Sequence, residues 1–250
     1  MCGIVGYLGN KSAKDVIIKG LKRLEYRGYD SAGISTLNGG TMEITKTQGK
    51  VADLIASISD NAHFGGLGIG HTRWATHGVP NDINAHPHSD NSGKFTLVHN
   101  GIIENYQSLK QLLTDNGITC KTDTDTEVLV QFMGYFHQKE KLDFVDTVRL
   151  ALNQVVGAYG IVGLCEDYPD MLIAARLGSP LLLGIGEDEF FVASDSSPII
   201  EYTRNIIFLD AGELAVIKPE EYQVRNISGN EVVPKKVEEI KYNLDEIEKG

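Results

Sequence analysis

The sequence is short of positive charge, with 23 Lys and Arg against 34 Asp and Glu, a formal net charge of −11 at pH 7 over 250 residues. An acidic balance of this size argues against an electropositive surface for nucleic acid or anionic lipid. Long apolar runs are also missing, since the stretch 153–165 falls short of the roughly 18–20 apolar residues that a membrane-spanning helix needs. The sequence therefore predicts neither a nucleic-acid-binding protein nor a membrane protein.

The N-terminus lacks an export signal, in which positive charge precedes an apolar run. CGIVGYLG follows Met1 directly, and the first lysine is Lys11. We therefore expect a cytoplasmic protein. Its 42% of hydrophobic residues is a globular composition, sufficient for a real core.

Cysteine is scarce, because only Cys2, Cys120 and Cys165 occur. An odd and widely spaced set cannot form a disulfide framework or a zinc knuckle. Cys120 and Cys165 lie in strand-like segments and are expected to be small buried packing residues. Cys2 follows the initiator methionine, whose removal is favoured before a small residue, so Cys2 would carry a free α-amine beside its thiol.

Glycine is abundant, with 27 residues, and proline is rare, with seven, which predicts many short elements joined by tight turns. Hydrophobic periodicity predicts strands over 2–8, 32–37, 66–74 and 94–101, and helices after Ser12, over 51–58, over 103–116 and over 125–153 with a break near Lys141. Six further strand-like segments follow at intervals of roughly ten residues and predict an antiparallel meander. This pattern favours an α+β layered domain over βαβ alternation.

The C-terminal part is more highly charged from about Lys218 onward. Residues 241–250 are expected to begin a linker. We therefore expect one domain over 2–240, at the N-terminal end of a longer protein.

Five of the seven histidines, His71, His77, His86, His88 and His99, fall within a short segment. Their spacing does not favour a metal site, because no helical i, i+4 pair, HExxH pattern or cysteine partner is present. Packing histidines and a polar binding loop remain open. Arg73 ends an apolar strand and needs a carboxylate or phosphate partner, either a ligand or a structural ion pair.

Asn100-Gly101 is expected at a strand end, where a side-chain amide and a backbone N–H could together stabilise an oxyanion; an ordinary turn is the alternative. Asp125 opens a helix in TDTDTE (122–127), and capping is the expected role of Asp123 and Glu127. RLGSP (176–180) reads as a turn.

The chemistry of Cys2 connects these residues. A thiol with a reference pKa of about 8.5 and an α-amine of about 7.7–8.0 are matched for proton transfer. An N-terminal cysteine therefore has its own base, which is the N-terminal nucleophile arrangement. It explains why the nucleophile stands directly after Met1.

Eight sequence blocks in order resemble the glutaminase (type 2 glutamine amidotransferase) domains of glucosamine-6-phosphate synthases. They are CGIVGYLG (2–9), LEYRGYDSAG (24–33), HTRWATHG (71–78), NAHPH (84–88), HNGIIENY (99–106), TDTE (124–127), GAYG (157–160) and RLGSPL (176–181). The related amidophosphoribosyltransferase glutaminases share the terminal CGI, but they have Tyr-Ser where Trp74-Ala75 stand here and lack HPH.

The resemblance implies the four-layer αββα sandwich of N-terminal nucleophile hydrolases, with largely antiparallel sheets. It implies that Cys2 attacks the carboxamide of L-glutamine and that a γ-glutamyl thioester is hydrolysed to L-glutamate. Asn100 and Gly101 would hold the oxyanion.

The resemblance also implies how glutamine is gripped. Arg73, with Thr76 and His77, would bind the α-carboxylate, and Asp125 would pair with the α-ammonium. Holding both ends positions the carboxamide for attack. Trp74 would lie on a loop that closes over the substrate.

The remaining matches have weaker implications. Arg27 and Tyr29 match a supporting segment near the nucleophile, and His86 matches a block without an assigned role. Asp123 stands where the family commonly has another residue, and alignment on TDTE selects Asp125 as the ammonium partner.

The expected partners follow from the same resemblance. No metal or cofactor is expected. Fructose 6-phosphate would be the ammonia acceptor only through a C-terminal region that is absent here, as the first step of amino-sugar biosynthesis, and the full-length enzyme would be a homodimer. Two alternatives remain: a non-catalytic glutamine-sensing domain, and an amidotransferase with another acceptor, such as a phosphoribosyl or asparagine-forming partner.

Overall fold

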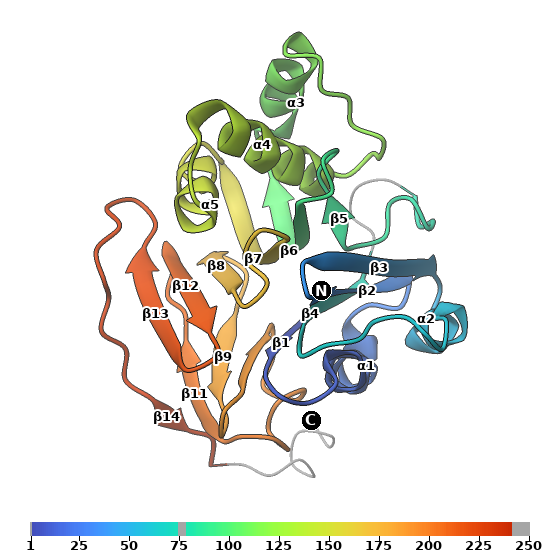
Figure 1. The fold of residues 1–250 in the computed structure, drawn as a ribbon, viewed down its shortest axis with the longest axis vertical. Helices are drawn as coiled ribbons and strands as arrows, with labels where there is room; N and C mark the ends of the chain where they lie inside the picture. The colour runs from blue at the N-terminus through green and yellow to red at the C-terminus, as the bar shows by residue number, and fades with distance from the viewer. Residues whose placement is uncertain (1, 75–78, 242–250) are drawn as a thin grey trace.

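The structure, a computed structural model, describes residues 2–74 and 79–241. In this part of the chain, two antiparallel sheets lie face to face (Figure 1). The eight-stranded sheet has the order β14 (Glu238–Glu239), β11 (Asn205–Phe208), β9 (Leu182–Ile185), β10 (Phe190–Ala193), β1 (Gly3–Leu8), β4 (Leu67–Arg73), β2 (Ser31–Asn38), β3 (Thr41–Gln48). The six-stranded sheet has the order β13 (Glu221–Asn226), β12 (Glu213–Lys218), β8 (Leu172–Leu177), β7 (Gly157–Cys165), β6 (Phe95–Ile103), β5 (His88–Ser89).

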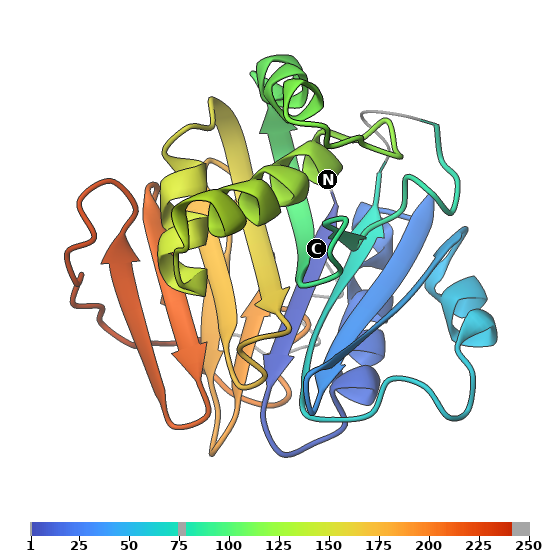
Figure 2. The ribbon, with the colours of Figure 1, turned by 45° about the horizontal axis from the view of Figure 1, so that its top comes forward.

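Helices cover the outer face of each sheet (Figure 2). α1 (Ala13–Leu24) and α2 (Val51–Ser57) pack on the eight-stranded sheet, and α4 (Asp125–Glu140) and α5 (Phe144–Leu152) pack on the six-stranded sheet. α3 (Tyr106–Asp115) lies beside α4 at one end of the molecule, and the 3₁₀ turn η1 (Glu25–Arg27) follows α1. The order of layers is therefore helix, sheet, sheet, helix.

Three apolar clusters fill the three spaces between these layers. Along β1, Val5 and Tyr7 belong to the cluster under α1, whereas Ile4 and Leu8 belong to the cluster between the sheets. This alternation follows from the two-residue period of a strand. A strand buried on both faces explains why CGIVGYL has no polar side beyond Cys2.

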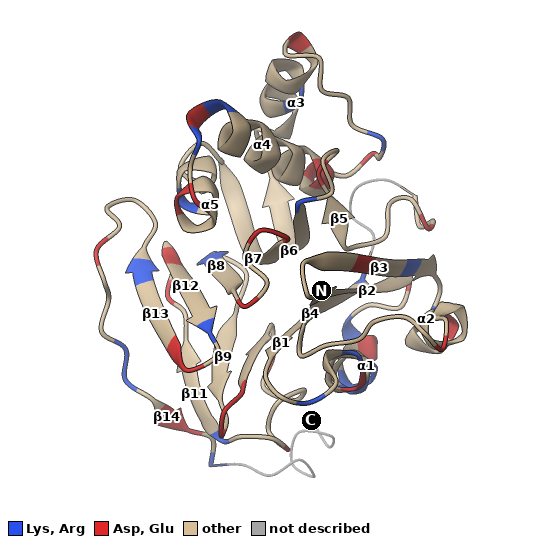
Figure 3. Ribbon diagram, in the orientation of Figure 1, with Lys and Arg blue, Asp and Glu red and all other residues tan. Residues whose placement is uncertain are grey.

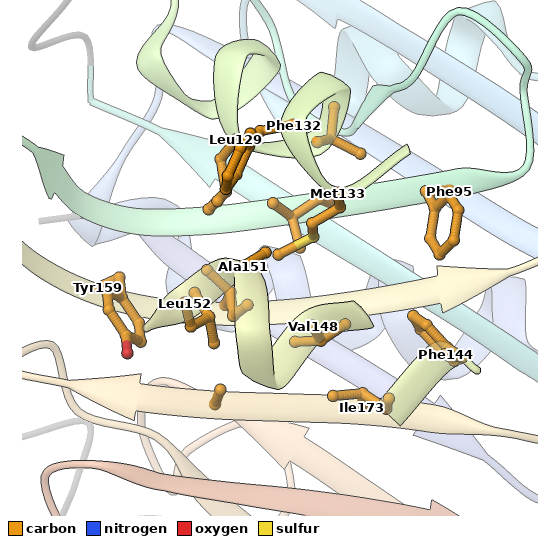
Figure 4. Packing of buried hydrophobic residues seen from close by; sticks show 14 of the residues in the cluster. Phe95, Leu129, Phe132, Met133, Phe144, Val148, Ala151, Leu152, Tyr159 and Ile173 are labelled. Carbon is orange, nitrogen blue, oxygen red and sulfur yellow. The ribbon is translucent and has the colours of Figure 1, made fainter. Parts of the chain in front are cut away.

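The space between the six-stranded sheet and its helices is filled from α4, α5 and the strands below them (Figure 4). Phe95 and Phe144 lie with ring centroids 5.8 Å apart, and both are buried. Complete burial of a side chain of this size contributes roughly 1.5–3 kcal/mol relative to exposure. Tight packing on this side holds β6 and the first turn of α4 in fixed relative positions.

The local signals for helix ends are confirmed. Ser12 caps α1 by accepting a hydrogen bond from the Asp15 N–H at 3.3 Å. Lys141 has a positive φ of 53° and ends α4, and Asp143 then caps α5. The expected break near Lys141 is thus a left-handed residue between two helices.

The predicted meander of the second half was wrong. Its strands are antiparallel but are shared between the sheets, since β7, β8 and β12 lie in one and β9, β10 and β11 in the other. The chain changes sheet after β8, at a turn where Gly178 has a positive φ of 97°. Strands that are apolar on both faces carry no signal of which sheet they join.

Two smaller predictions were also wrong. β6 runs two residues beyond Gly101, because Ile102 and Ile103 continue the ladder with β7. Asp123 does not cap α4: Thr124 does, by accepting a hydrogen bond from the Glu127 N–H, while Asp123 accepts one from the Asn84 amide.

Charged residues lie mainly in loops, at strand ends and on helices (Figure 3). The strands at the centre of the sandwich, β1, β6 and β7, carry no Lys, Arg, Asp or Glu. Within 2–74 and 79–241, no helix is long and apolar enough to cross a lipid bilayer.

Candidate active site

Cys2 lies at the start of β1, between β10 and β4 in the middle of the eight-stranded sheet. Its Sγ accepts a hydrogen bond from the Trp74 N–H at 3.1 Å and donates to the Trp74 carbonyl oxygen at 3.5 Å. β1 reaches this position because Gly3 pairs with Thr72 on β4, where a Cβ at Gly3 would lie 2.6 Å from the Thr72 hydroxyl. The ladder therefore fixes the thiol beside the end of β4.

Burial raises the pKa of the Cys2 thiol above its ordinary value. The backbone N–H of Trp74 and the guanidinium of Arg73 act in the opposite direction, because they favour the thiolate. Burial is the larger effect, so the resting group is a thiol. A base is then required to generate the nucleophile.

Asn100 and Gly101 lie on β6 of the facing sheet. The Asn100 Nδ2 donates a hydrogen bond to the carbonyl oxygen of Cys2 at 3.0 Å. Gly101 has a positive φ of 131°, and a Cβ there would collide with the carbonyl oxygen of Ala158. Glycine is therefore required for β6 and β7 to approach at this point.

Arg73 and Asp125 line the same cavity, and each side chain is buried. Arg73 ends β4, and its carbonyl oxygen accepts a hydrogen bond from the Asp30 N–H at 3.0 Å. Asp125 is the first residue of α4, where the helix dipole favours a carboxylate, and its Oδ2 accepts from the Ile103 N–H at 2.8 Å. Burial lowers the pKa of Arg73, and the Cys2 group in its thiolate form and the carboxylates of Asp30 and Asp125 act in the opposite direction. The cavity thus has a cationic and an anionic group facing one small space.

Arg27 stabilises the segment next to Cys2 through contacts with Ser194 and Asp195. Its Nη1 donates to the Ser194 carbonyl oxygen at 3.1 Å and pairs with Asp195 at 3.3 Å. Ser194 in turn accepts from the Ile4 N–H at 3.0 Å through its Oγ. Arg27 therefore braces the end of β10 against the start of β1.

Tyr29 and Trp74 form the rim. Their rings meet edge to face, with centroids 5.5 Å apart at 66°, and about half of each side chain is exposed. Trp74 lines the cavity, whereas Tyr29 contacts Trp74 from outside it. Two exposed aromatic rings at a cavity mouth are suited to cover a small ligand.

Four buried histidines form one group at the inner wall of the cavity, and three of them, His71, His86 and His99, line it. His86 stacks on His71 with centroids 4.2 Å apart, and His88 meets His86 edge on at 4.8 Å. His99 lies across from them, with Nδ1 at 2.9 Å from the Thr126 hydroxyl and its backbone N–H donating to His86 Nδ1 at 3.3 Å. The sequence left two interpretations open for His71, His88 and His99, packing histidines or part of a polar binding loop, and assigned none of the three a specific role.

Burial lowers the pKa of His71 to about 3 and lowers the pKa values of His86 and His88 well below 6.5. An unfolded histidine binds a proton near pH 6.5, whereas these native rings remain neutral. We therefore expect the free energy of unfolding to fall as the pH drops below about 6.5, by up to about 1.4 kcal/mol per pH unit for each ring. Above about pH 6.5 the rings are neutral in both states, so these histidines should not make the stability depend on pH. Urea titrations between about pH 7.5 and 5 measure this.

A matched variant isolates one ring. His86→Phe keeps a planar ring against His71 but removes one titratable group, so its stability should fall less steeply between pH 6.5 and 5 than that of the wild type, by up to about 1.4 kcal/mol per unit. A wild-type stability that is flat across this range would contradict the neutral histidine group.

The cavity has a volume of about 320 Å³, at the lower end of the range for small-molecule sites. Eight predicted site residues line it, whereas Thr76 and His77 lie outside the described residues. The eight are Cys2, Arg27, Arg73, Trp74, His86, Asn100, Gly101 and Asp125. Seven lining residues had been given no role: His71, His99, Ile102, Thr124, Thr126, Ser179 and Pro180. Ser179 and Pro180 come from the RLGSP turn, whose only sequence signal was its place in the family resemblance.

Comparisons with known proteins agree with this geometry. The profile described as glutamine amidotransferase domain matches residues 56–226. Two proteins named glutamine–fructose-6-phosphate aminotransferase (isomerizing), from Bacteroides thetaiotaomicron and Thermococcus kodakarensis, are 50% and 49% identical over 100% of this chain. The chain spans 41% of the length of each of these relatives.

A solved structure, glutamine phosphoribosylpyrophosphate amidotransferase from B. subtilis in complex with ADP and GMP, superposes with a TM-score of 0.78 at 28% identity. The match covers 92% of this chain and 50% of that one. Together with the layer order, it confirms the expected α+β fold, the four-layer αββα sandwich of N-terminal nucleophile hydrolases.

Proposed function

The chain belongs to the glutamine amidotransferase domain family, and on this premise we propose that its cavity binds L-glutamine and hydrolyses the side-chain amide to L-glutamate and ammonia. One observation carries the proposal: the Cys2 thiol, the Asn100 amide and the Arg73 and Asp125 charges line a single small cavity. The thiol supplies a nucleophile, the amide an oxyanion donor, and the two charges an amino-acid clamp.

The clamp fixes the substrate at its α-carbon. Arg73, with Thr76 and His77, binds the α-carboxylate, and Asp125 binds the α-ammonium. A bidentate guanidinium–carboxylate contact gives direction as well as affinity. The side-chain carboxamide then lies beside Cys2, and Trp74 covers the substrate from the rim.

The reaction begins when the α-amine of Cys2, freed by removal of Met1, takes the thiol proton. The Sγ attacks the carboxamide carbon, an S–C bond forms, and the carbonyl oxygen becomes an oxyanion bound by the Asn100 Nδ2 and the Gly101 N–H. The amine returns the proton to the leaving nitrogen as the C–N bond breaks and ammonia departs. Water then hydrolyses the γ-glutamyl thioester to L-glutamate and restores the thiol.

The ammonia would serve an acceptor bound by another part of the full protein. Relatives that align over the whole of this chain are named for fructose 6-phosphate. We therefore propose glucosamine 6-phosphate formation, the first step of amino-sugar biosynthesis, in a cytoplasmic homodimer, with Arg27 and Tyr29 supporting the glutaminase site. The domain proper is proposed to span 2–240, with a linker from 241.

An electrophilic glutamine analogue tests the site directly. A diazoketone in place of the carboxamide should alkylate Cys2 at one label per chain and abolish glutamate release in parallel, because the clamp delivers the reactive carbon to the thiol. Intact mass and peptide mapping measure the labelling. Excess L-glutamate should protect Cys2, whereas Cys120 and Cys165 should remain unlabelled.

Two results would contradict this function. Labelling of Cys120 at the rate of Cys2 would show general thiol reactivity rather than a glutamine site. Saturable binding of glutamine without glutamate release, in protein shown by mass to lack Met1, would favour the non-catalytic glutamine-sensing alternative.

A further inference from the structure

His71 is buried in the wall of the cavity, on the strand that ends in Arg73. Along β4, Leu67 and Ile69 face the space between the sheets, and His71 and Arg73 follow them at the same two-residue period. Along β6, Val98 faces the same space, and Asn100 follows it. The imidazole of His71 therefore meets the amide of Asn100 between the sheets.

The hydrogen bonds at His71 determine which ring nitrogen carries the proton. Its Nε2 lies 3.1 Å from the carbonyl oxygen of His99 and 3.0 Å from Oδ1 of Asn100. A backbone carbonyl only accepts, so Nε2 must be the donor. Burial lowers the pKa of His71 to about 3, so the ring is neutral at physiological pH and Nδ1 carries a lone pair.

The same hydrogen bonds determine the orientation of the Asn100 amide, that is, which side of it carries the oxygen and which the nitrogen. A distance to one terminal atom would not be enough, because the amide oxygen and nitrogen are similar in size. The Nε2–H of His71 requires an oxygen opposite it, and the carbonyl oxygen of Cys2 requires a donor on the other side, at 3.0 Å. Both partners give the same answer: Oδ1 faces His71 and Nδ2 faces Cys2. One N–H of Nδ2 is held by the Cys2 carbonyl, and the second is left for an oxyanion.

We propose that His71 is a positioning residue for the glutaminase reaction: as the neutral Nε2–H tautomer it holds the Asn100 amide with its nitrogen directed at the oxyanion site. The inference rests on the proposed function. His86 stacks on the ring at 4.2 Å and so restricts its plane, and the Nδ1 of His86 accepts a hydrogen bond from the His99 N–H. Without the His71 donor, a rotated Asn100 amide would present its oxygen to the developing negative charge.

The test compares two substitutions of His71. His71→Leu removes the donor at similar volume, and we expect kcat for glutamine hydrolysis to fall roughly tenfold to a hundredfold, while KM and the Kd of L-glutamate change by less than about twofold, because the oxyanion exists only in the transition state. His71→Gln places an amide N–H near the position of Nε2 and should restore most of kcat. His137→Leu, at a half-buried histidine on α4, is the control and should leave kcat unchanged.

Three outcomes would overturn the role of His71. They are an unchanged kcat in His71→Leu, a His71→Gln variant as slow as His71→Leu, and a rise in KM that accounts for the whole loss.

A measurement on the wild-type protein tests the same proposal and does not depend on whether a variant folds. Nitrogen NMR of protein with labelled histidine should show His71 as the neutral Nε2–H form from about pH 5 to 9, and a neutral Nδ1–H form or a titrating ring would refute the proposal. Failure of the proposed function looks different, since the wild type would then release no glutamate at all.

Discussion

Replacement of Cys2 by alanine is expected to lower the rate of glutamate release from glutamine by roughly 10⁴-fold or more, the scale of loss when a covalent nucleophile is removed. Among the described residues, Cys2 is the only cysteine that lines the cavity. The Asn100 amide and the clamp would remain, so the variant should still bind L-glutamate with nearly wild-type affinity. Coupled assays of glutamate release and calorimetric titration measure the two quantities.

The matched control is Cys120→Ala, since Cys120 packs on the apolar cluster below α4, away from the cavity. It should keep wild-type turnover. A second variant separates the thiol from the amine: an uncleaved residue placed before Cys2 keeps the sulfur but moves the α-amine away, and turnover should be lost almost as completely. Wild-type turnover in Cys2→Ala would refute the assignment, and full activity in the extended chain would refute the amine as base.

The sequence specified more of the strands and helices than of their arrangement. β1, β2, β4 and the helices with Ser12 and Lys141 at their ends follow from periodicity and local end signals. The assignment of each strand to a sheet did not follow, because β8 and β9 are both largely apolar and are joined by a short turn, yet lie in different layers. Pairing is decided by long-range packing, which leaves no local pattern.

The sequence likewise predicts some features of the site and leaves others to the structure. The two-residue period would place His71 with Arg73 on one face of β4, but only the opposition of β4 and β6 brings His71 against Asn100. Asp125 was recognised by family resemblance, whereas its local pattern is that of an ordinary helix start. A histidine that positions an amide has the sequence pattern of a packing histidine, and hydrogen-bond geometry is needed to tell them apart.

Replacement of Arg73 or of Asp125 should abolish recognition of one α-substituent of glutamine, the carboxylate for Arg73 and the ammonium for Asp125, and leave recognition of the other intact. Wild-type protein is expected to prefer glutamine over 4-aminobutanamide, which lacks the α-carboxylate, by roughly 10²–10³-fold in kcat/KM, since truncating one member of a buried charge pair costs about 2–5 kcal/mol. Arg73→Met should lose this preference while retaining preference over glutaramate, which lacks the α-ammonium. Asp125→Asn should show the reverse pattern, because the asparagine oxygen can still accept the hydrogen bond from the Ile103 N–H.

The crossed pattern is what distinguishes a clamp from a structural ion pair. If Arg73 and Asp125 only stabilised each other, both variants would lose activity toward every amide equally and would unfold at lower urea concentration together. Arg73→Lys supplies the control for charge: it keeps the cation but cannot form two parallel hydrogen bonds, so its preference for glutamine should fall between wild type and Arg73→Met. Equal losses on glutamine and 4-aminobutanamide in Arg73→Met would show that the guanidinium does not contact the substrate carboxylate, and the α-carboxylate site would then have to be sought elsewhere in the cavity.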